Sequence, residues 1–252
     1  MFMLSSFPFI KDSKDFPLDD IVALLDWRHN MFKSSKSEIS SLSRDNNTLI
    51  PVFFIDDKYF VPKQFGKANK PAYPGMRKTS IQLFSNLSNI KYTTVPVITE
   101  VIDGFQYGLI QWFDNVVSVD KKRDITADDI SEILECGLEL SRSNVFHLDL
   151  NHTNIVKTDR FYFIDPSLAK NHLRPVHNYF NERAVSYHWS PEILNGGFVS
   201  EKSSIYSVGK VLEFCNVKIN KGVDNLISSF TEKNPVDRPS FSDAYNEIND
   251  LL

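Results

Sequence analysis

Apolar positions in the second half of the chain recur with the period of an amphipathic helix. Between Thr126 and Ser143 they fall on one helical face, and Thr126 or Asp128 can cap its start. These apolar positions are Ile130, Ile133, Leu134, Leu138 and Leu140. Further helices are predicted at residues 203–216, 222–231 and 240–251. The second half is therefore predicted to be rich in helices.

The first half instead carries β-branched and aromatic runs that predict two strand pairs. The runs TLIPVFFI and KYFVPKQF meet at Asp56-Asp57, which is a hairpin signal, and Pro51 and Pro62 push both runs toward sheet edges or strand ends. A second pair, VPVITEV and GFQYGLIQWF, meets at Asp103-Gly104. The first half is therefore predicted to be mainly β-structure.

The order of these elements predicts an α+β chain with a boundary near residues 113–117. Helical spacing within residues 18–43 predicts two short helices before the first strand. We therefore expect a helical extension over residues 1–48, a β-rich part over residues 49–114 and a helical part over residues 115–252.

The charge balance argues against nucleic acid or an anionic membrane as a partner. The chain has 28 Lys and Arg against 32 Asp and Glu, a formal net charge of -4. No uncharged apolar run approaches the roughly 20 residues of a membrane span. We expect neither nucleic-acid nor membrane binding.

The cysteines and the N-terminus indicate a cytoplasmic protein. Cys136 and Cys215 are too few for a disulfide framework and lack metal or redox spacing, so both are predicted to be buried and reduced. The first residues have no basic region and reach Lys11 and Asp12 before any long apolar run, which is atypical of a signal peptide.

Residues 145–166, VFHLDLNHTNIVKTDRFYFIDP, place polar groups beside two short apolar runs. Asp149 and Asn154 follow the first run, and Asp165 ends the second. A tight turn at residues 158–160 would return Asp165 to the neighbourhood of Asn154. A carboxylate and an amide oxygen suit Mg²⁺, and a second carboxylate can orient or deprotonate a hydroxyl.

The pattern H-x-D-L-x-x-x-N, followed by a strand that ends in Asp, resembles the catalytic loop and metal-binding Asp of the protein kinase superfamily. Alone, H-x-D-x-x-x-x-N is also similar to small-molecule phosphotransferases. Downstream, residues 190–192 (SPE) resemble the A-P-E element, residues 205–209 (IYSVG) a helix start, and residues 234–240 (NPVDRPS) the late R-P-S element. These downstream elements favour the eukaryotic-type protein kinases.

The resemblance implies a bilobal kinase-like α+β fold with a small β-rich N-lobe and a helical C-lobe. It implies transfer of a phosphoryl group from ATP, with Mg²⁺, to Ser or Thr hydroxyls of a protein substrate. Asp149 would orient or deprotonate the hydroxyl, while Asn154 and Asp165 would hold Mg²⁺. Glu192 and Arg238 would form a buried structural ion pair.

The resemblance also implies a nucleotide site. Lys63 would contact the ATP phosphates, and Val61 and Val156 would sandwich the adenine. The hinge that receives the adenine would consist of Ile110, Gln111 and Trp112, with Ile110 near the gatekeeper position. His147 is expected to be a packed loop residue rather than a metal ligand.

Several residues depart from the kinase pattern. No G-x-G-x-x-G precedes Lys63, and residues 64–99 contain no Asp or Glu to pair with it. Leu148 replaces the Arg of H-R-D, so activity is not expected to depend on loop phosphorylation. Pro166-Ser167 replaces Phe-Gly of D-F-G, and Ser204 replaces the Asp that braces the catalytic loop.

These departures keep an alternative function open. A pseudokinase would bind a nucleotide or a protein partner without transferring phosphate, but it often loses the equivalents of Asp149 or Asp165, and both are present. The small size and the missing N-lobe elements resemble reduced kinases of viruses, phages and bacterial effectors. For such a protein the site of action would be the host cytosol.

Overall fold

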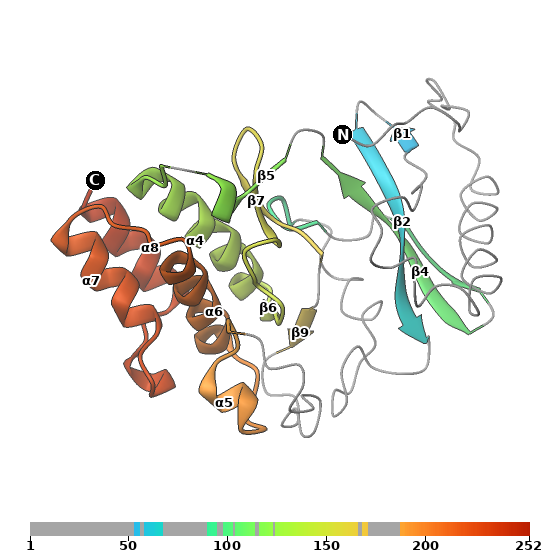
Figure 1. The fold of residues 1–252 in the computed structure, drawn as a ribbon. Coiled ribbons are helices and arrows are strands. Elements are labelled where there is room, and N and C mark those ends of the chain that lie inside the picture. Colours follow the sequence, from blue (N-terminus) through green and yellow to red (C-terminus); the bar gives the residue numbers. More distant parts are fainter. Residues whose placement is uncertain are drawn as a thin grey trace. The chain divides into compact units, whose positions relative to one another are not determined.

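The computed structural model describes residues 53–55, 58–67, 90–94, 98–102, 104–113, 116–122, 124–165, 168–170 and 187–252 of the chain. The helical extension expected over residues 1–48 lies outside these residues. The chain is a mixed α+β protein that divides into two compact units (Figure 1). The first unit contains residues 1–69 and 96–114, and the second contains residues 70–95 and 115–252.

The first unit contains a four-stranded antiparallel sheet in the order β1-β2-β4-β3. Its strands are β1 (Phe53–Ile55), β2 (Lys58–Lys67), β3 (Ile98–Ile102) and β4 (Phe105–Trp112). Both predicted strand pairs are confirmed as antiparallel neighbours. Gly104 joins β3 to β4 with a φ of 77°, a conformation that glycine adopts without strain.

Pro62 lies in the middle of β2, opposite Leu109 of β4, and not at a strand end. Strand β2 also lies between β1 and β4 in the sheet order, and its pairing with β4 continues past the proline to Lys67. The expectation of a sheet edge or strand end is therefore wrong for Pro62, and Pro51 lies outside the described residues.

The second unit contains the helices predicted from apolar spacing. They are α4 (Ala127–Arg142), α6 (Glu201–Phe214), α7 (Lys221–Phe230) and α8 (Phe241–Asp250). A short helix that was not predicted, α5 (Pro191–Leu194), precedes α6. Two 3-10 turns, Val119–Lys121 and Pro235–Asp237, were not predicted. No helix in the described part of the chain is long and apolar enough to cross a membrane.

Short strands in the second unit carry the segment 145–166. Strands β5 (Val117–Ser118), β7 (Ile155–Lys157) and β8 (Phe161–Phe163) form one antiparallel sheet. Strand β6 (Val145–His147) pairs with β9 (Leu168–Lys170). The two runs predicted as strands thus form part of two small sheets.

Helix α4 begins at a reciprocal cap. The Thr126 hydroxyl accepts a hydrogen bond from the Asp129 N–H, and the Asp129 carboxylate accepts one from the Thr126 N–H. Of the two caps considered from the sequence, Thr126 is confirmed. The apolar face that follows is buried, with Ile130, Ile133 and Leu134 fully shielded from solvent.

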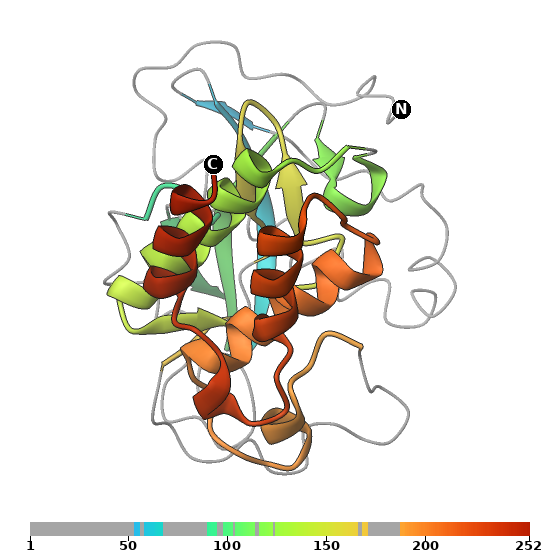
Figure 2. The ribbon, with the colours of Figure 1, turned by 90° about the vertical axis from the view of Figure 1, so that its left-hand side faces the viewer.

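Close contacts between helices form the core of the second unit, and Figure 2 shows α8 running beside α4. A Cβ on Gly137 of α4 would lie 2.2 Å from the Phe241 ring of α8. A Cβ on Gly209 of α6 would lie 2.7 Å from Phe230 of α7. Both glycines therefore allow neighbouring helices to approach closely.

Both cysteines are free thiols, as expected. Cys136 is buried, and burial raises the pKa of its thiol. The expectation that Cys215 is also buried is wrong, because it lies at the C-terminal end of α6 and is only half-buried. Burial still raises the pKa of Cys215 to about 11, so the thiol is protonated near neutral pH.

Candidate active site

The β7–β8 hairpin returns the chain from Asn154 to Asp165, as the sequence predicts. Its turn is closed by a hydrogen bond from the Thr158 N–H to the Arg160 carbonyl oxygen. At the open end, the Ile164 N–H donates to the Asn154 carbonyl oxygen at 2.9 Å. Asp165 directly follows Ile164 in the chain. The hairpin therefore brings Asp165 close to Asn154.

Asn154 is buried and holds the loop that carries Asp149. Its amide nitrogen donates to the Asp149 carbonyl oxygen at 2.7 Å and lies 3.4 Å from the carboxylate oxygen Oδ2. The Asn154 N–H donates to the Asn151 carbonyl oxygen, which closes the loop. Two of the three residues that the sequence assigns to one site, Asp149 and Asn154, are therefore in direct contact.

Asp165 has an unusual backbone conformation, with a φ of 58°. This left-handed region is uncommon for residues other than glycine, although Asp and Asn tolerate it best. The residue is exposed, in contrast to the buried Phe163 just before it. Such a conformation persists when the surrounding structure enforces it, and it often occurs at functional sites.

His147 links the Asp149 loop to the strand that precedes Asp165. Its Nδ1 accepts a hydrogen bond from the Asp149 N–H at 3.1 Å, and its Nε2 lies 3.1 Å from the Ile164 carbonyl oxygen. Since Nδ1 is an acceptor, a neutral ring carries its proton on Nε2 and donates it to Ile164. Both ring nitrogens are used in packing the loop, so the expectation that His147 is no metal ligand fits this arrangement.

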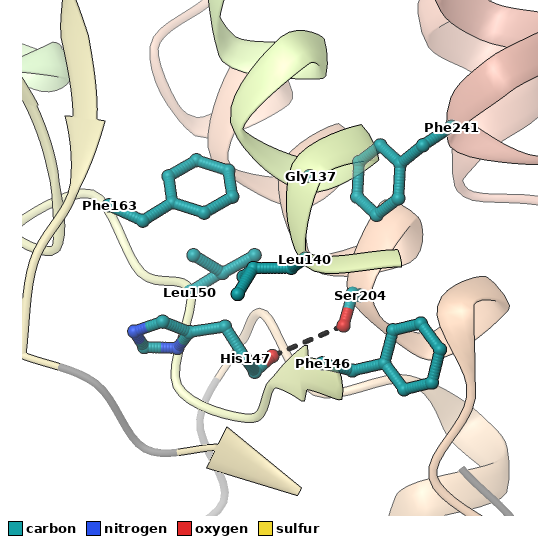
Figure 3. Close-up of a pocket in the computed structure, with 8 residues that line it drawn as sticks. All are labelled: Gly137, Leu140, Phe146, His147, Leu150, Phe163, Ser204 and Phe241. Atoms are coloured by element: carbon teal, nitrogen blue, oxygen red, sulfur yellow. Dashed lines mark hydrogen bonds between the residues drawn. The ribbon is translucent and has the colours of Figure 1, made fainter. Parts of the chain in front are cut away.

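Ser204 of α6 braces the same loop through a hydrogen bond to its backbone. Its hydroxyl donates to the His147 carbonyl oxygen at 3.2 Å, drawn as the dashed line in Figure 3. The apolar residues around it, among them Leu140, Leu150 and Phe163, leave no room for a water molecule. The serine that replaces an expected aspartate therefore still supports the loop, and the surrounding pocket is packed core rather than a ligand site.

His188 is the residue of this site that the sequence did not reveal. Its Nε2 lies 3.0 Å from Oδ1 of Asp149, with the imidazole side chain 1% exposed and the carboxylate 38% exposed. His188 is distant from Asp149 in sequence and lies two residues before the SPE element at residues 190–192. No spacing rule connects the two, so only the folded chain could reveal this pair.

The environment of Asp149 favours its ionised form. Burial alone would raise the pKa of this carboxyl. The imidazole of His188, whose Nε2 lies 3.0 Å from Oδ1, together with the hydrogen bond from Asn151, outweighs burial, and the pKa is lowered from its ordinary value. Asp149 is therefore a carboxylate at neutral pH.

Three aromatic rings form a partly exposed cluster beside this loop, here called the ring cluster: His152, Tyr187 and Phe214. Their ring centroids lie between 4.6 and 5.9 Å apart, and the rings are nearly parallel. The Tyr187 hydroxyl accepts a hydrogen bond from the His152 N–H. Tyr187 and Phe214 remain exposed, so the cluster presents aromatic surface next to Asp149.

The predicted ion pair between Glu192 and Arg238 is confirmed. The guanidinium binds the carboxylate with two hydrogen bonds of 2.7 and 3.0 Å, and the Arg238 side chain is fully buried. Further donors bind the carbonyl oxygens of Lys202, Glu232 and Lys233. The pair links α5 to the segment before α8. Its role is therefore structural, as expected.

The residues predicted to bind the nucleotide are divided between the two units. Val156 is buried in β7 of the second unit, paired with Ser118 and Tyr162. In the first unit, Val61 of β2 lies opposite Ile110 of β4, Phe60 opposite Gln111, and Tyr59 opposite Trp112. The structure brings Val61 and Ile110 together as strand partners.

Lys63 also lies in β2, opposite Gly108 of β4. Its contact with ATP phosphates stays a prediction, as does a nucleotide site shared with Val156.

The chemistry of the predicted metal ligands suits a hard cation with few protein ligands. The amide nitrogen of Asn154 is engaged with Asp149, so its oxygen is the atom left for a cation. Asp165 is an exposed residue and carries the carboxylate of the pair. Within the described residues no three His, Cys, Asp or Glu side chains cluster as a metal cage, and Mg²⁺ is the cation that needs only one or two carboxylates beside substrate phosphates.

No protein-family model matches the chain, and no curated protein matches its sequence. The functional interpretation therefore depends on the residues and their geometry.

Proposed function

We propose that the protein transfers the γ-phosphoryl group of ATP, with Mg²⁺, to Ser or Thr hydroxyls of a protein substrate. One observation carries the proposal: Asn154 is hydrogen-bonded to Asp149, and the β7–β8 hairpin returns the chain beside Asn154 just before Asp165. A hydroxyl-orienting carboxylate next to two oxygen ligands for Mg²⁺ is the arrangement that phosphoryl transfer requires.

Asp149 would orient the attacking hydroxyl by accepting its proton in a hydrogen bond. Its lowered pKa keeps it an acceptor at neutral pH. The backbone contacts from His147 and Asn154 hold the loop, so little reorientation is needed when the substrate arrives. Most of the contribution of this residue would therefore come from positioning.

Asn154 and Asp165 would hold Mg²⁺ through the amide oxygen and the carboxylate. A bound Mg²⁺ neutralises charge on the phosphate oxygens. The left-handed backbone at Asp165 supports this role, because such conformations often occur at functional sites. The preceding residue, Ile164, is hydrogen-bonded to Asn154, the other proposed ligand. Asn154 serves both the loop and the cation, since its nitrogen and oxygen have different partners.

The residues of the ATP site are proposed from the resemblance to kinases. Lys63 would contact the phosphates, and Val61, Val156, Ile110, Gln111 and Trp112 would enclose the adenine. A sheet in the first unit and helices in the second are the elements expected in the N-lobe and C-lobe of a kinase-like fold, which supports the proposal. Opposed positions of Val61 and Ile110 in the sheet support their assignment to one wall of this site.

Exposed aromatic surface beside Asp149 supports a protein substrate rather than a small molecule. Phe214 and Tyr187 of the ring cluster are large apolar side chains that remain in contact with solvent. Such surface is typical of protein-binding sites. The Glu192–Arg238 pair supports the same reading, because it stabilises the segment between Tyr187 and α6.

A phosphate-transfer assay tests the proposal. The purified chain and an Asp165→Ala variant are incubated with γ-labelled ATP, Mg²⁺ and a cell lysate, and ATP binding is measured separately. We expect label on lysate Ser or Thr residues with the unmodified chain only. ATP binding without transfer in both samples would instead favour a pseudokinase, a nucleotide- or partner-binding module.

A further inference from the structure

We propose that His188 is a positioning residue that holds the carboxylate of Asp149 in the orientation needed for transfer. The proposal rests on the proposed phosphoryl-transfer function. Its basis is geometric: the His188 Nε2 and Asp149 Oδ1 atoms lie 3.0 Å apart. Within the described residues, no Lys or Arg forms an ion pair with Asp149. Among the described residues, His188 is therefore the basic side chain whose ion-pair contact with this carboxylate is seen.

The main-chain position of His188 is fixed by the helix that also braces the Asp149 loop. On α6, the Ser207 hydroxyl donates to the His188 carbonyl oxygen at 2.7 Å, while the Ser204 hydroxyl donates to the His147 carbonyl oxygen at 3.2 Å. Residues three apart lie on the same face of a helix. The two serines thus hold His188 and the Asp149 loop against a common rigid element.

The ring of His188 is also held in place. Tyr187 and Trp189 contact it edge-on, with ring centroids 5.5 and 5.7 Å away, and the side chain is 1% exposed. A ring so enclosed has little freedom to rotate away from Asp149. By contrast, the Asp149 side chain is 38% exposed, and its other side-chain contacts, from Asn151 and Asn154, are longer, at 3.3 and 3.4 Å.

Asp149 is held by contacts from its own loop and from one distant segment. Within the loop, His147 accepts from its N–H, Asn154 donates to its carbonyl oxygen and lies 3.4 Å from Oδ2, and Asn151 lies 3.3 Å from Oδ1. From outside the loop, His188 lies 3.0 Å from Oδ1. His188 is the contact that relates the carboxylate to α6, and its role is therefore orientation.

Two variants separate this role from simple packing. His188→Phe keeps a ring between Tyr187 and Trp189 but removes both nitrogens, whereas His188→Gln keeps an N–H donor at a similar reach. If His188 positions Asp149, His188→Phe lowers kcat by about 100-fold, the loss typical of a misplaced catalytic group, with KM for ATP unchanged. His188→Gln restores most of that loss.

The control is Glu247→Gln on the exposed face of α8, which should leave kcat and Tm unchanged. Equal kcat for His188→Phe and the unmodified chain would overturn the proposal. So would equal losses in His188→Phe and His188→Gln, because a packing role does not depend on the donor.

A second measurement does not depend on enzyme activity. In ¹⁵N-histidine NMR spectra, assigned with His188→Gln, we expect Asp149→Asn to shift the His188 Nε2 resonance by several ppm and to leave His147 Nε2 nearly unchanged. An unmoved His188 signal overturns the pairing. If the unmodified chain transfers no phosphate, the proposed function fails, and this spectrum alone still decides whether His188 holds Asp149.

Discussion

At the scale of single residues, Arg238 is the clearest case of a side chain whose loss the fold cannot compensate. Arg238→Ala would leave the Glu192 carboxylate and three carbonyl oxygens without their buried donor. Breaking a buried pair in this way costs about 3–5 kcal/mol. Urea denaturation should show that loss, and Arg142→Ala, at an exposed position of α4, should stay within about 0.5 kcal/mol. Equal losses in the two variants would contradict the account.

The sequence predicts individual residues well where a motif fixes several positions together. The return of the chain from Asn154 toward Asp165 could be predicted because the spacing of two short strands allows one hairpin between them, whereas the roles of Asp149, Asn154 and Asp165 stay predictions. The Glu192–Arg238 pair could be found only through the resemblance to kinases. His188 could not, because its contact with Asp149 depends on how α6 fixes two distant segments.

Among the elements, the contact between α4 and α8 predicts that a glycine-to-alanine substitution in a helix lowers stability instead of raising it. Alanine normally stabilises a helix relative to glycine by about 1 kcal/mol. At Gly137 the new Cβ would lie 2.2 Å from the ring of Phe241, which is itself buried. We expect Gly137→Ala to destabilise the chain by about 1–3 kcal/mol.

Thermal or urea denaturation measures this effect, with Ser141→Ala on the same helix as the control. Ser141 lies near the end of α4 and is only half-buried, so its replacement should change stability little. A Gly137→Ala variant that is more stable than the unmodified chain would show that Phe241 moves aside at no cost.

The N-terminus of α4 predicts a pH dependence. Burial would raise the pKa of Asp129, but Lys122 and the Thr126 N–H outweigh burial and lower it. A lowered pKa stabilises the fold above the unfolded-state pKa of about 3.9, and this contribution is lost as pH falls through the folded-state pKa. Asp129→Asn should therefore reduce stability by about 1 kcal/mol at pH 7 and by much less near pH 3.

Denaturation curves of both proteins at the two pH values measure this difference. A deficit of the same size at pH 3 would show that the charge of Asp129 is not its cause.

Elements with strong periodicity are the ones that the sequence predicts. Helices α4, α6, α7 and α8 follow from apolar spacing and caps, and both hairpins of the first unit follow from their turn residues. Helix α5 is missed, since four residues carry no periodicity. The mid-strand position of Pro62 is missed, because local sequence does not show that β2 continues to pair with β4 beyond the proline.

For the molecule as a whole, the proposed function requires that Mg²⁺ and ATP bind together. A ligand present at 100 times its Kd stabilises the folded state by about 2.7 kcal/mol. ATP with Mg²⁺ should therefore raise Tm by several degrees, ATP with EDTA by less, and Asp165→Ala should remove the difference. The comparison uses the full chain, since residues proposed to bind ATP come from both units. A Tm that does not respond to Mg²⁺ with ATP would contradict the assigned cofactors.

The central claim is that Asp149 acts on a hydroxyl during phosphoryl transfer. Its most direct test is the rate of phosphate transfer from γ-labelled ATP to Ser and Thr residues by the unmodified chain and by Asp149→Asn, which keeps the size of the side chain. A residue that orients and accepts the proton of the nucleophile contributes about 100- to 10,000-fold. The account predicts a loss in that range with ATP binding retained; equal rates in the two proteins, or no transfer by the unmodified chain, would contradict it.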